Sequence, residues 1–400
     1  MSSTKIADNL YWVGAVDWNM RTFHGSTYTT RRGTTYNAFL IIDEKITLVD
    51  TVHAPFAREL IENISSLVDP SKIDYIIANH VEPDHSGALP ELLKLCPKAK
   101  VFGTAKCRDG LAKYYGVAMD FQVVKSGDTL SLGKRTLSFL EAAMIHWPDS
   151  MFTYIVEDQV LMPNDAFGQH YATAFRFDDE VDPAALREEA SKYYANILWP
   201  FGTVIAAKIK EIQKRAIPIK MIAPSHGVIW RKNPAKIIEQ YGAWAQDTMK
   251  NKVVIFYETM WGSTEKMARK ILDGVLSEGV EAMVWDISKI DRTDMVNEML
   301  DAKGYLIGSS THDNDMLPLM AGFLEFFKGL KPKKRIAAVF GSYGWGGGAI
   351  AGMEKVLRSA GVEIVLPSQG IQFAPTADEL NASYQFGKEF ARKIIQQKSS

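Results

Sequence analysis

Short apolar runs separated by turn residues dominate the first 250 residues of the chain. The apolar runs 36–42 and 46–50 flank a polar turn, which indicates a β-hairpin. A buried strand is predicted at 75–79, directly before His80. Further strands are predicted at 100–102, 130–141 and 151–161, and helices at 57–67, 87–95 and 107–115. This mixture of strands and helices predicts an αβ/βα sandwich rather than a purely parallel sheet.

A different pattern begins after a helical stretch at 234–249. Apolar strands and amphipathic helices then alternate strictly, which is typical of a doubly wound parallel sheet. The strands are predicted at 252–257, 280–286, 305–309, 335–341 and 363–366, and the helices at 264–276, 292–300, 317–330 and 349–360. We therefore predict an α/β protein with two domains, 1–250 and 251–400.

The composition is ordinary for a soluble globular protein, with 46% hydrophobic and 23% charged residues. The net charge of -1 gives no reason to expect nucleic acid or an anionic membrane as a partner. The basic run 331–335 is predicted to be a solvated turn. The N-terminus carries no apolar signal segment, and no apolar run approaches the ~18 residues of a membrane span. We expect a cytoplasmic protein.

The two cysteines, Cys96 and Cys107, form no CxxC pair, so an iron–sulfur or zinc site with thiolate ligands is disfavoured. A disulfide between them stays open, although a reduced cytosolic setting fits better.

A dense group of potential metal ligands follows the strand at 75–79. It comprises His80, Glu82, Asp84 and His85. His146, Asp165 and His226 lie where other strands are predicted to end. Taken singly, these three are more often core, turn or cap residues than ligands. Together, the seven side chains provide four imidazoles and three carboxylates, enough for two metal ions and one bridging carboxylate.

The pattern His-x-[His/Glu]-x-Asp-His, followed by distant His, Asp and His residues, resembles the signature of the metallo-β-lactamase fold. Hydrolases of that fold usually carry His at the third position, where this chain has Glu82. A carboxylate is a harder ligand than imidazole and favours iron over zinc. Together with a flavodoxin-like second domain, the chain resembles the flavodiiron protein family, and the resemblance includes the segments 13–18, 146–150 and 193–196.

The resemblance implies a role for each candidate ligand. One iron would be held by His80, Glu82 and His146, the other by Asp84, His85 and His226, with Asp165 as the bridge. The match at His85 establishes its residue type and not its coordination in every state. The resemblance also places His24, Trp147 and one of Tyr193 or Tyr194 beside the diiron pocket, although buried packing explains these side chains equally well.

The second domain carries a loop at 258–264 that resembles the flavodoxin phosphate loop. Thr259, Gly262, Ser263 and Thr264 occupy matching positions, whereas Met260 and Trp261 replace two hydroxyl residues. More of the phosphate binding must therefore come from backbone N–H groups at the helix N-terminus. The loop contains neither a Walker A motif nor GxGxxG.

Two further loops follow strands at the expected switch point of the sheet. They contribute Ser310, Thr311, His312, Asp313 and Asn314, and Ser342, Tyr343, Gly344, Trp345, Gly346 and Gly347. Glycines allow the backbone to approach a ring system, and Tyr343 or Trp345 can stack on it. The three loops together predict FMN as the cofactor.

The resemblance implies that FMN passes electrons to two non-haem irons, which reduce dioxygen to water, nitric oxide to nitrous oxide, or both, as detoxification in an anaerobe. It also implies a head-to-tail homodimer or a homotetramer, in which the flavin of one chain lies beside the irons of another. The chain has no pair of CxxC motifs, so we expect a separate electron donor, either a rubredoxin or a reduced deazaflavin.

Two alternatives stay open at this point. The first is a metal-dependent hydrolase of the β-lactamase fold that uses a metal-bound hydroxide. Glu82 and the flavodoxin-like domain argue against it. The second is a flavoprotein electron carrier whose first domain is free of metal, and the complete set of seven ligands argues against it.

Overall fold

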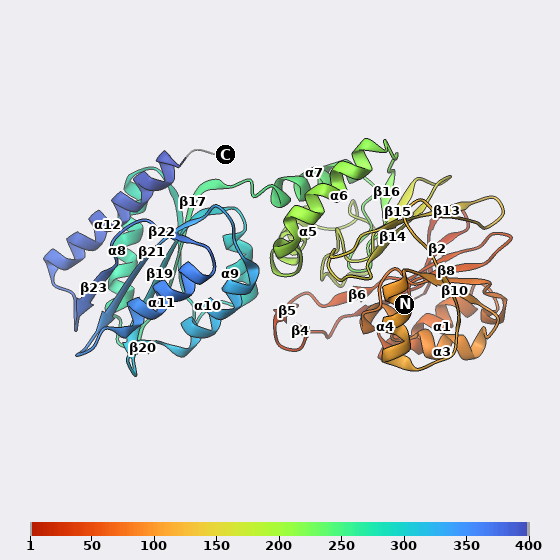
Figure 1. Ribbon diagram of the computed structural model, residues 1–400, viewed down its shortest axis with the longest axis horizontal. Coiled ribbons are helices and arrows are strands. Elements are labelled where there is room, and N and C mark those ends of the chain that lie inside the picture. Colours follow the sequence, from red (N-terminus) through yellow and green to blue (C-terminus); the bar gives the residue numbers. More distant parts are fainter. Residues whose placement is uncertain (1, 398–400) are drawn as a thin grey trace. The chain divides into compact units, whose positions relative to one another are not determined.

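The computed structural model describes residues 2–397 and divides into two compact units, Met1–Gly242 and Ala243–Ser400. They are called unit 1 and unit 2 below (Figure 1). Helix α7 (Pro234–Ala245) crosses the division, and strand β17 (Lys250–Glu258) is the first strand of unit 2.

Unit 1 contains two facing β-sheets. In order across the first sheet, its strands are β1 (Thr4–Ala7), β2 (Leu10–Trp12), β7 (Phe39–Ile41), β8 (Thr47–Val49), β9 (Tyr75–Ile77), β10 (Lys100–Gly103) and β11 (Asp120–Val123). The second sheet contains β12 (Thr129–Ser131), β13 (Thr136–Glu141), β14 (Met151–Ile155), β15 (Val160–Met162) and β16 (Met221–Ile222). Both sheets mix parallel and antiparallel pairs. In the first sheet, β1, β2, β7 and β8 pair antiparallel and β8 to β11 pair parallel. In the second sheet, β12 to β15 pair antiparallel and β15 pairs parallel with β16.

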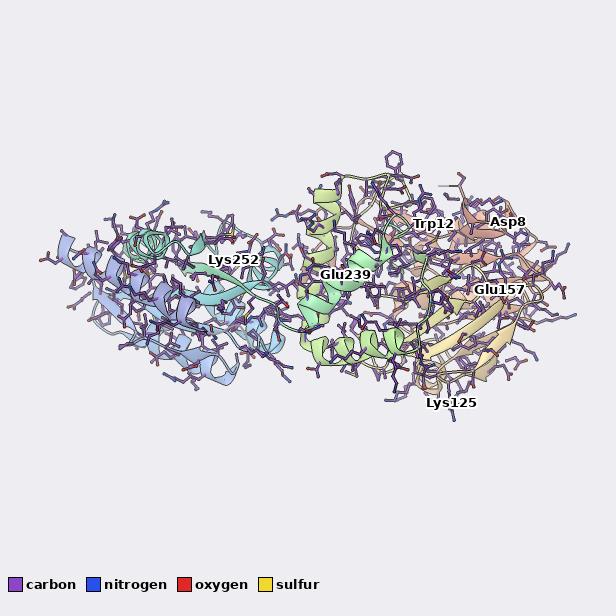
Figure 2. All side chains as sticks on the ribbon, turned by 90° about the horizontal axis from the view of Figure 1, so that it is seen from above. Asp8, Trp12, Lys125, Glu157, Glu239 and Lys252 are labelled. Carbon is purple, nitrogen blue, oxygen red and sulfur yellow. The ribbon has the colours of Figure 1, made fainter. Side chains whose placement is uncertain are left out.

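The alternation of side chains along each strand assigns them to the two faces of the first sheet. Phe39, Ile41 and Val49 point toward the second sheet and share a core with its strands. Leu40 and Leu48 point the other way, into a core with helices α1 (Ala57–Ser65), α3 (Leu89–Leu95) and α4 (Ala105–Tyr115). This arrangement, with helices outside two central sheets, confirms the predicted αβ/βα sandwich. In Figure 2 the Lys125 side chain lies at the lower edge of unit 1, whereas Trp12 is completely buried.

The helices predicted at 57–67, 87–95 and 107–115 lie close to observed helices, whereas the two helices between residues 183 and 214 and several short elements were not predicted. The longer helices are α1 (Ala57–Ser65), α3 (Leu89–Leu95), α4 (Ala105–Tyr115), α5 (Pro183–Tyr193) and α6 (Gly202–Lys214). The short elements are η1 (Ala54–Phe56), η2 (Pro70–Lys72), α2 (Pro83–Ser86), η3 (Tyr194–Leu198), η4 (Trp199–Phe201), β3 (Ala15–Asp17), β4 (Thr22–Phe23), β5 (Tyr28–Thr29) and β6 (Thr34–Tyr36).

Two strand predictions in unit 1 were wrong. The run 130–141 is a hairpin of β12 and β13, with Gly133 at a φ of 118° in the turn. The run 151–161 is likewise a hairpin, in which β14 and β15 flank Gln159 at a φ of 57°. Both turns carry short polar segments, 133–135 and 157–159, and the predicted strands were wrongly extended through them.

Unit 2 is a parallel sheet in the order β18-β17-β19-β21-β22, as the alternating pattern predicts. The strands are β18 (Glu281–Asp286), β17, β19 (Ala302–His312), β21 (Ile336–Tyr343) and β22 (Glu363–Ile364), with β20 (Asp315–Met316) and β23 (Gln369–Gln372) at their ends. The helices are α8 (Ser263–Ser277), α9 (Arg292–Met299), α10 (Pro318–Leu330), α11 (Gly348–Ser359) and α12 (Ala377–Gln396). Val253 and Ile255 pack against α8 and α12, whereas Phe256 points the other way, toward Phe323 of α10.

Three features of unit 2 differ from the sequence-based expectation. The segment 309–314 is not a free loop, because β19 continues to His312 and pairs with β20. The basic run 331–335 is not wholly solvated, because Arg335 is buried in an ion pair with Asp247. Helix α12 was not predicted, although Thr376 and Glu379 form a capping box at its start.

Cys96 and Cys107 are both buried and free, so no disulfide joins them. Burial raises the pKa of the Cys96 thiol to about 11, which disfavours the reactive thiolate. Across residues 2–397, no helix has both the length and the apolar character that crossing a membrane requires.

Glycines allow α8 and α12 to pack closely. A Cβ on Gly387 would lie 2.1 Å from the Ile271 carbonyl oxygen, so Gly387→Ala is expected to destabilise unit 2 by ~1–3 kcal/mol. Gly322→Ala in α10 is the matched control, because no atom lies within 4 Å of its added Cβ. Denaturant unfolding measures both variants. Equal stability of Gly387→Ala and the unmodified protein would show that the two helices can separate at no cost.

Candidate functional site

The seven candidate ligands lie together in unit 1 as two groups. One group contains His80, Glu82, His146 and Asp165, and the other contains Asp84, His85 and His226. Within each group, one ligand atom from each residue lies within 4.8 Å of those of the others. All seven side chains are buried at the ends of strands of both sheets. Asp84 and His85 belong to the single-turn helix α2 rather than to an open loop.

Asp165 lies between the two groups and presents one carboxylate oxygen to each. Its Oδ2 lies 3.3 Å from His146 Nε2 and 3.7 Å from His80 Nε2. Its Oδ1 lies 3.0 Å from His85 Nε2 and 3.5 Å from His226 Nε2. A carboxylate in this position can bridge two metal ions.

The polar atoms of this cluster are poorly satisfied by the protein itself. Within residues 2–397, no hydrogen-bond partner is found for either oxygen of Asp84, either ring nitrogen of His85, Asp165 Oδ2 or His226 Nε2. Leaving a buried polar atom unpaired costs about 1–3 kcal/mol, so such a concentration requires an explanation. Metal ions explain it, and a set of imidazoles and carboxylates without thiolates fits iron.

The electrostatics of the cluster are consistent with a cation site. Burial opposes the charged form of His85, but the carboxylates of Asp84 and Asp165 outweigh it and raise the pKa of His85 to about 9. The same pocket therefore attracts a positive charge strongly. Because a ligand imidazole must be deprotonated, metal ions and protons compete for this site.

Residues that the sequence did not single out orient the ligand imidazoles. The Nδ1 atom of His80 lies 3.0 Å from Asp149 Oδ2, which also accepts a hydrogen bond of 2.7 Å from the Val81 N–H. The Nδ1 atom of His226 lies 2.6 Å from the Thr35 carbonyl oxygen. Since carboxylate and carbonyl oxygens accept, both Nδ1 atoms carry protons, and Nε2 is left for the metal. Asp149 lies in the segment 146–150, but Thr35 gave no signal in the sequence.

The backbone at Gly227 also holds His226 in place. Its φ is 80°, and a Cβ there would lie 1.9 Å from Gln169 Oε1. The same oxygen accepts a 2.7 Å hydrogen bond from the Val228 N–H. A side chain at position 227 would therefore displace Gln169 and break its hydrogen bond with Val228, two residues after the ligand His226.

Three of the four further residues predicted beside the pocket contact a ligand. His24 Nε2 lies 2.9 Å from Glu82 Oε1, and the Tyr193 hydroxyl donates a 3.1 Å hydrogen bond to Asp165 Oδ1. The Trp147 ring packs edge-on against His80, with 5.1 Å between ring centroids. Tyr194 packs instead against Tyr241, at 5.1 Å, so Tyr193 is the tyrosine that reaches the ligands.

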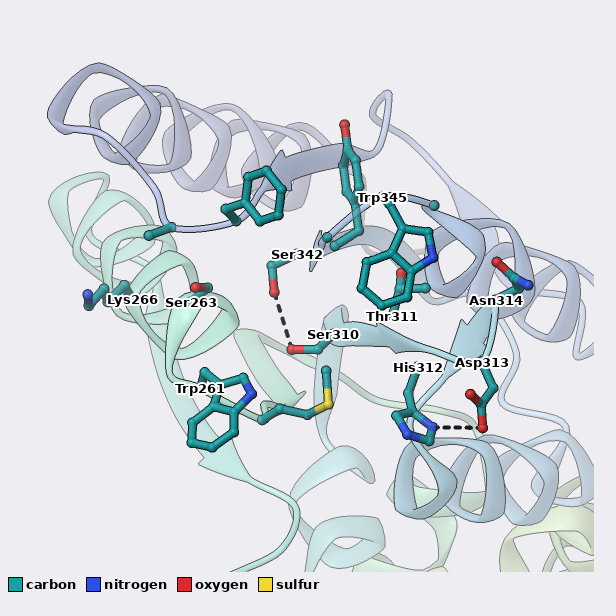
Figure 3. A pocket seen from close by; sticks show the side chains of 16 residues that line it. Trp261, Ser263, Lys266, Ser310, Thr311, His312, Asp313, Asn314, Ser342 and Trp345 are labelled. Carbon is teal, nitrogen blue, oxygen red and sulfur yellow. Dashed lines mark hydrogen bonds and ion pairs between the residues drawn. The ribbon is translucent and has the colours of Figure 1, made fainter.

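Unit 2 contains a cavity of about 720 Å³ at the carboxyl ends of its strands (Figure 3). The predicted residues that line it are Met260, Trp261, Ser263, Ser310, Thr311, His312, Asp313, Asn314, Ser342, Tyr343, Gly344, Trp345 and Gly346. Lys266, Phe373 and Ala374 also line the cavity and were not predicted. Thr259, Gly262, Thr264 and Gly347 were predicted and do not line it.

Two of the predicted threonines support the cavity wall instead of lining it. Thr264 is completely buried, and its hydroxyl forms hydrogen bonds with Ser310 at 3.0 Å and Ser342 at 2.9 Å. Thr259 Oγ1 accepts a 3.1 Å hydrogen bond from the Gly262 N–H. These bonds tie the three loops together.

The cavity has the features that bind a phosphate and a planar ring. Helix α8 begins here behind Gly262, whose φ is 83°, and no side chain caps its first turn. A helix N-terminus attracts a phosphate, and the Lys266 side chain adds positive charge. Trp261 and Trp345 are 92% and 94% exposed at the cavity and offer aromatic faces. These residues fit FMN.

Comparisons with known proteins agree with this description. Residues 34–227 match the model of the ODP family beta lactamase, and residues 255–387 match that of flavodoxin. The chain is 50% identical over 391 residues to a nitric oxide reductase of Moorella thermoacetica, covering 97% of this chain and 98% of the relative. It is 42% identical over 395 residues to the anaerobic nitric oxide reductase flavorubredoxin of Salmonella typhi, covering 98% of this chain and 82% of that protein.

Solved structures resemble the chain over its full length. The rubredoxin oxygen:oxidoreductase of Desulfovibrio gigas superposes with a TM-score of 0.97 at 37% identity, covering 100% of both chains. The flavodiiron protein of Giardia intestinalis gives a TM-score of 0.95 at 33% identity, covering 99% of this chain and 97% of that one.

Removal of the bridging carboxylate tests the arrangement of the cluster. Asp165→Ala is expected to lose both metal ions while the cavity of unit 2 keeps its ligand, because Asp165 faces both groups of ligands and lies in unit 1. Metal analysis and the absorption spectrum measure the two outcomes. Asp109→Ala, which removes an exposed carboxylate, is the control. Two metal ions retained in Asp165→Ala would contradict the bridging position.

The orienting carboxylate is expected to matter almost as much as a ligand. Asp149→Ala should lower metal affinity by ~10–100-fold, since His80 loses the partner that fixes its tautomer. A competition titration with a chelator measures the change against the same Asp109→Ala control. Unchanged affinity would mean that packing alone orients His80.

Proposed function

The chain belongs to the flavodiiron protein family, and on this premise we propose that it reduces a diatomic gas with electrons that pass through FMN to a non-haem diiron site. The products are water from dioxygen, nitrous oxide from nitric oxide, or both. The names of the Moorella and Salmonella relatives support nitric oxide as a substrate, and the name of the Desulfovibrio protein supports dioxygen. In an anaerobe, either reaction removes a toxic gas.

The observation that carries this proposal is the buried cluster of unpaired ligand atoms around Asp165. We assign His80, Glu82 and His146 to one iron, Asp84, His85 and His226 to the other, and Asp165 to the bridge. When bound, the irons supply redox chemistry at a site where a diatomic can bind between two metals.

The protein around the ligands shapes the pocket. His24, with 33% of its side chain exposed, lies on the solvent side of Glu82 and can hydrogen-bond to it. Tyr193 is completely buried, and its hydroxyl holds Asp165 Oδ1. Trp147 covers one edge of His80 and limits the access of water to that ligand. These three side chains therefore keep the carboxylates and imidazoles in place and exclude bulk water.

We assign FMN to the cavity of unit 2, with its phosphate at the start of α8 and its ring near Trp261 and Trp345. These tryptophans are almost fully exposed, which is unusual for large aromatic side chains that face only water. Their exposure supports a head-to-tail homodimer, or a homotetramer built from such dimers, in which the flavin of one chain lies beside the irons of another.

We propose a rubredoxin as the source of the electrons, with a reduced deazaflavin as the second candidate. The name of the Desulfovibrio protein supports the first choice. We place the reaction in the cytoplasm, without nucleic acid or membrane as a partner.

The two alternatives from the sequence fit these observations less well. A hydrolase of the β-lactamase fold has no use for the cavity of unit 2 or for Glu82. A flavoprotein electron carrier without metal would leave Asp84, His85 and Asp165 buried with only ion pairs among the ligands themselves, at a cost in free energy.

Metal analysis and anaerobic turnover together test the proposed function. The purified protein is expected to contain about two irons and one FMN per chain and to oxidise reduced rubredoxin when dioxygen or nitric oxide is added. Comparison of the two gases under identical conditions identifies the preferred substrate. Zinc without flavin, or a protein with both cofactors that consumes neither gas, would refute the proposal.

A further inference from the structure

Two charged side chains outside the metal site are buried on the inner face of helix α5. Glu189 is 4% exposed and Lys192 is 2% exposed. Residues three positions apart lie on the same face of a helix, so the two side chains are neighbours. Burying charged groups costs free energy, and their position beside a reaction pocket suggests that they contribute to the reaction.

Glu189 is connected to solvent through Arg32. The Nε atom of Arg32 donates a 3.1 Å hydrogen bond to Glu189 Oε1, and 43% of the Arg32 side chain is exposed. The second oxygen, Glu189 Oε2, is buried and has no hydrogen-bond partner within residues 2–397. One oxygen therefore faces a partly exposed cation, and the other is free to exchange a proton.

Polar side chains continue from Lys192 to the metal ligands. Lys192 Nζ lies 5.6 Å from the centroid of the Tyr28 ring, and the His170 ring lies 4.9 Å from the same centroid. The His170 ring is also 5.0 Å from that of Tyr193, whose hydroxyl donates to Asp165. Ring contacts therefore connect Lys192 with Tyr193, and hydrogen bonds connect Glu189 with Arg32 at one end and Tyr193 with the bridging carboxylate at the other.

We propose that Glu189 and Lys192 form a proton relay from solvent to the diiron pocket. This inference rests on the proposed function, because each dioxygen reduced to two waters consumes four protons, and each pair of nitric oxide molecules reduced to nitrous oxide and water consumes two. The Lys192 ammonium releases a proton that is taken up by the substrate oxygen atom leaving the pocket as water, and the Glu189 carboxyl group reprotonates the resulting amine. The Glu189 carboxylate then takes a proton from water beside Arg32. One proton is transferred in each cycle, and no electron moves.

The charges around Glu189 suit this role. Burial raises the pKa of the Glu189 carboxyl group to about 7, and the nearby Glu188 adds to the effect, whereas Lys192 and Arg32 oppose it. An acid with a pKa near neutrality can both hold and release a proton under working conditions. The relay donates below this pKa, so its rate falls as the pH rises through about 7.

Variants at the two positions test the relay in the complete protein. The fully reduced protein is mixed rapidly with dioxygen in weakly buffered solution, and an indicator dye follows proton uptake. Glu189→Gln and Lys192→Met are expected to slow proton uptake at least tenfold and to remove the fall in rate near pH 7, with iron and FMN content unchanged. Glu189→Asp should recover part of the rate.

Glu188→Gln is the matched control, because Glu188 is the adjacent residue, is 56% exposed, and also accepts a hydrogen bond from Arg32. Well below pH 7, where Glu189 stays protonated, its rate of proton uptake should equal that of the unmodified protein. Equal rates and equal pH profiles in all variants would overturn the relay but not the proposed function. Failure of the unmodified protein to reduce either gas would refute the proposed function itself.

An infrared titration of the oxidised protein gives a readout that does not depend on turnover. A protonated carboxyl band is expected to disappear near pH 7 in the unmodified protein, at a lower pH in Glu188→Gln because Glu188 raises the pKa of Glu189, and to be absent from Glu189→Gln. In Lys192→Met the same band should persist to higher pH, because the cation that favours the carboxylate is gone. A Glu189 side chain that is ionised throughout the neutral range would overturn the proposal, even if a variant lost its iron.

Discussion

The structure of unit 1 depends on the need to neutralise seven ionisable side chains in one buried pocket. Four imidazoles and three carboxylates lie together, and several of their polar atoms have no partner within the part of the chain that the structure describes. Asp165 presents one carboxylate oxygen to each group of ligands. The negative charge of the carboxylates is therefore neutralised on both sides only when a cation lies in each group. Asp149 and the Thr35 carbonyl then determine which imidazole nitrogen faces inward.

Unit 2 solves a simpler problem, because it must bind one flat anionic molecule. The carboxyl ends of its parallel strands and the start of α8 form the cavity, and the hydroxyls of Thr264, Ser310 and Ser342 join its loops. Little of this depends on ionisable groups. The free-energy cost of burying charged groups therefore falls mainly on unit 1, whereas unit 2 binds the cofactor through which electrons pass.

Much of the fold and most of the candidate ligands could be predicted from the sequence, because both produce local patterns. The period of apolar residues predicted the sandwich and the doubly wound sheet, and four ligands are concentrated in 80–85. The hairpin turns at Gly133 and Gln159 were missed because each polar segment is only about three residues long and lies between two apolar runs that were joined into one strand. Thr35 could not be found, since it acts through its backbone carbonyl on a histidine far along the chain. The ligand roles themselves stay a proposal.

The order of the ligands along the chain has a consequence for how the protein matures. The group around His80 and His146 is complete as soon as Asp165 has been synthesised, but the other group needs His226, close to the end of unit 1. On the ribosome, one ligand set therefore exists before the other. The two metal positions therefore become available at different times during synthesis. The second ion can bind only after nearly the whole first unit has emerged and its two sheets have come together.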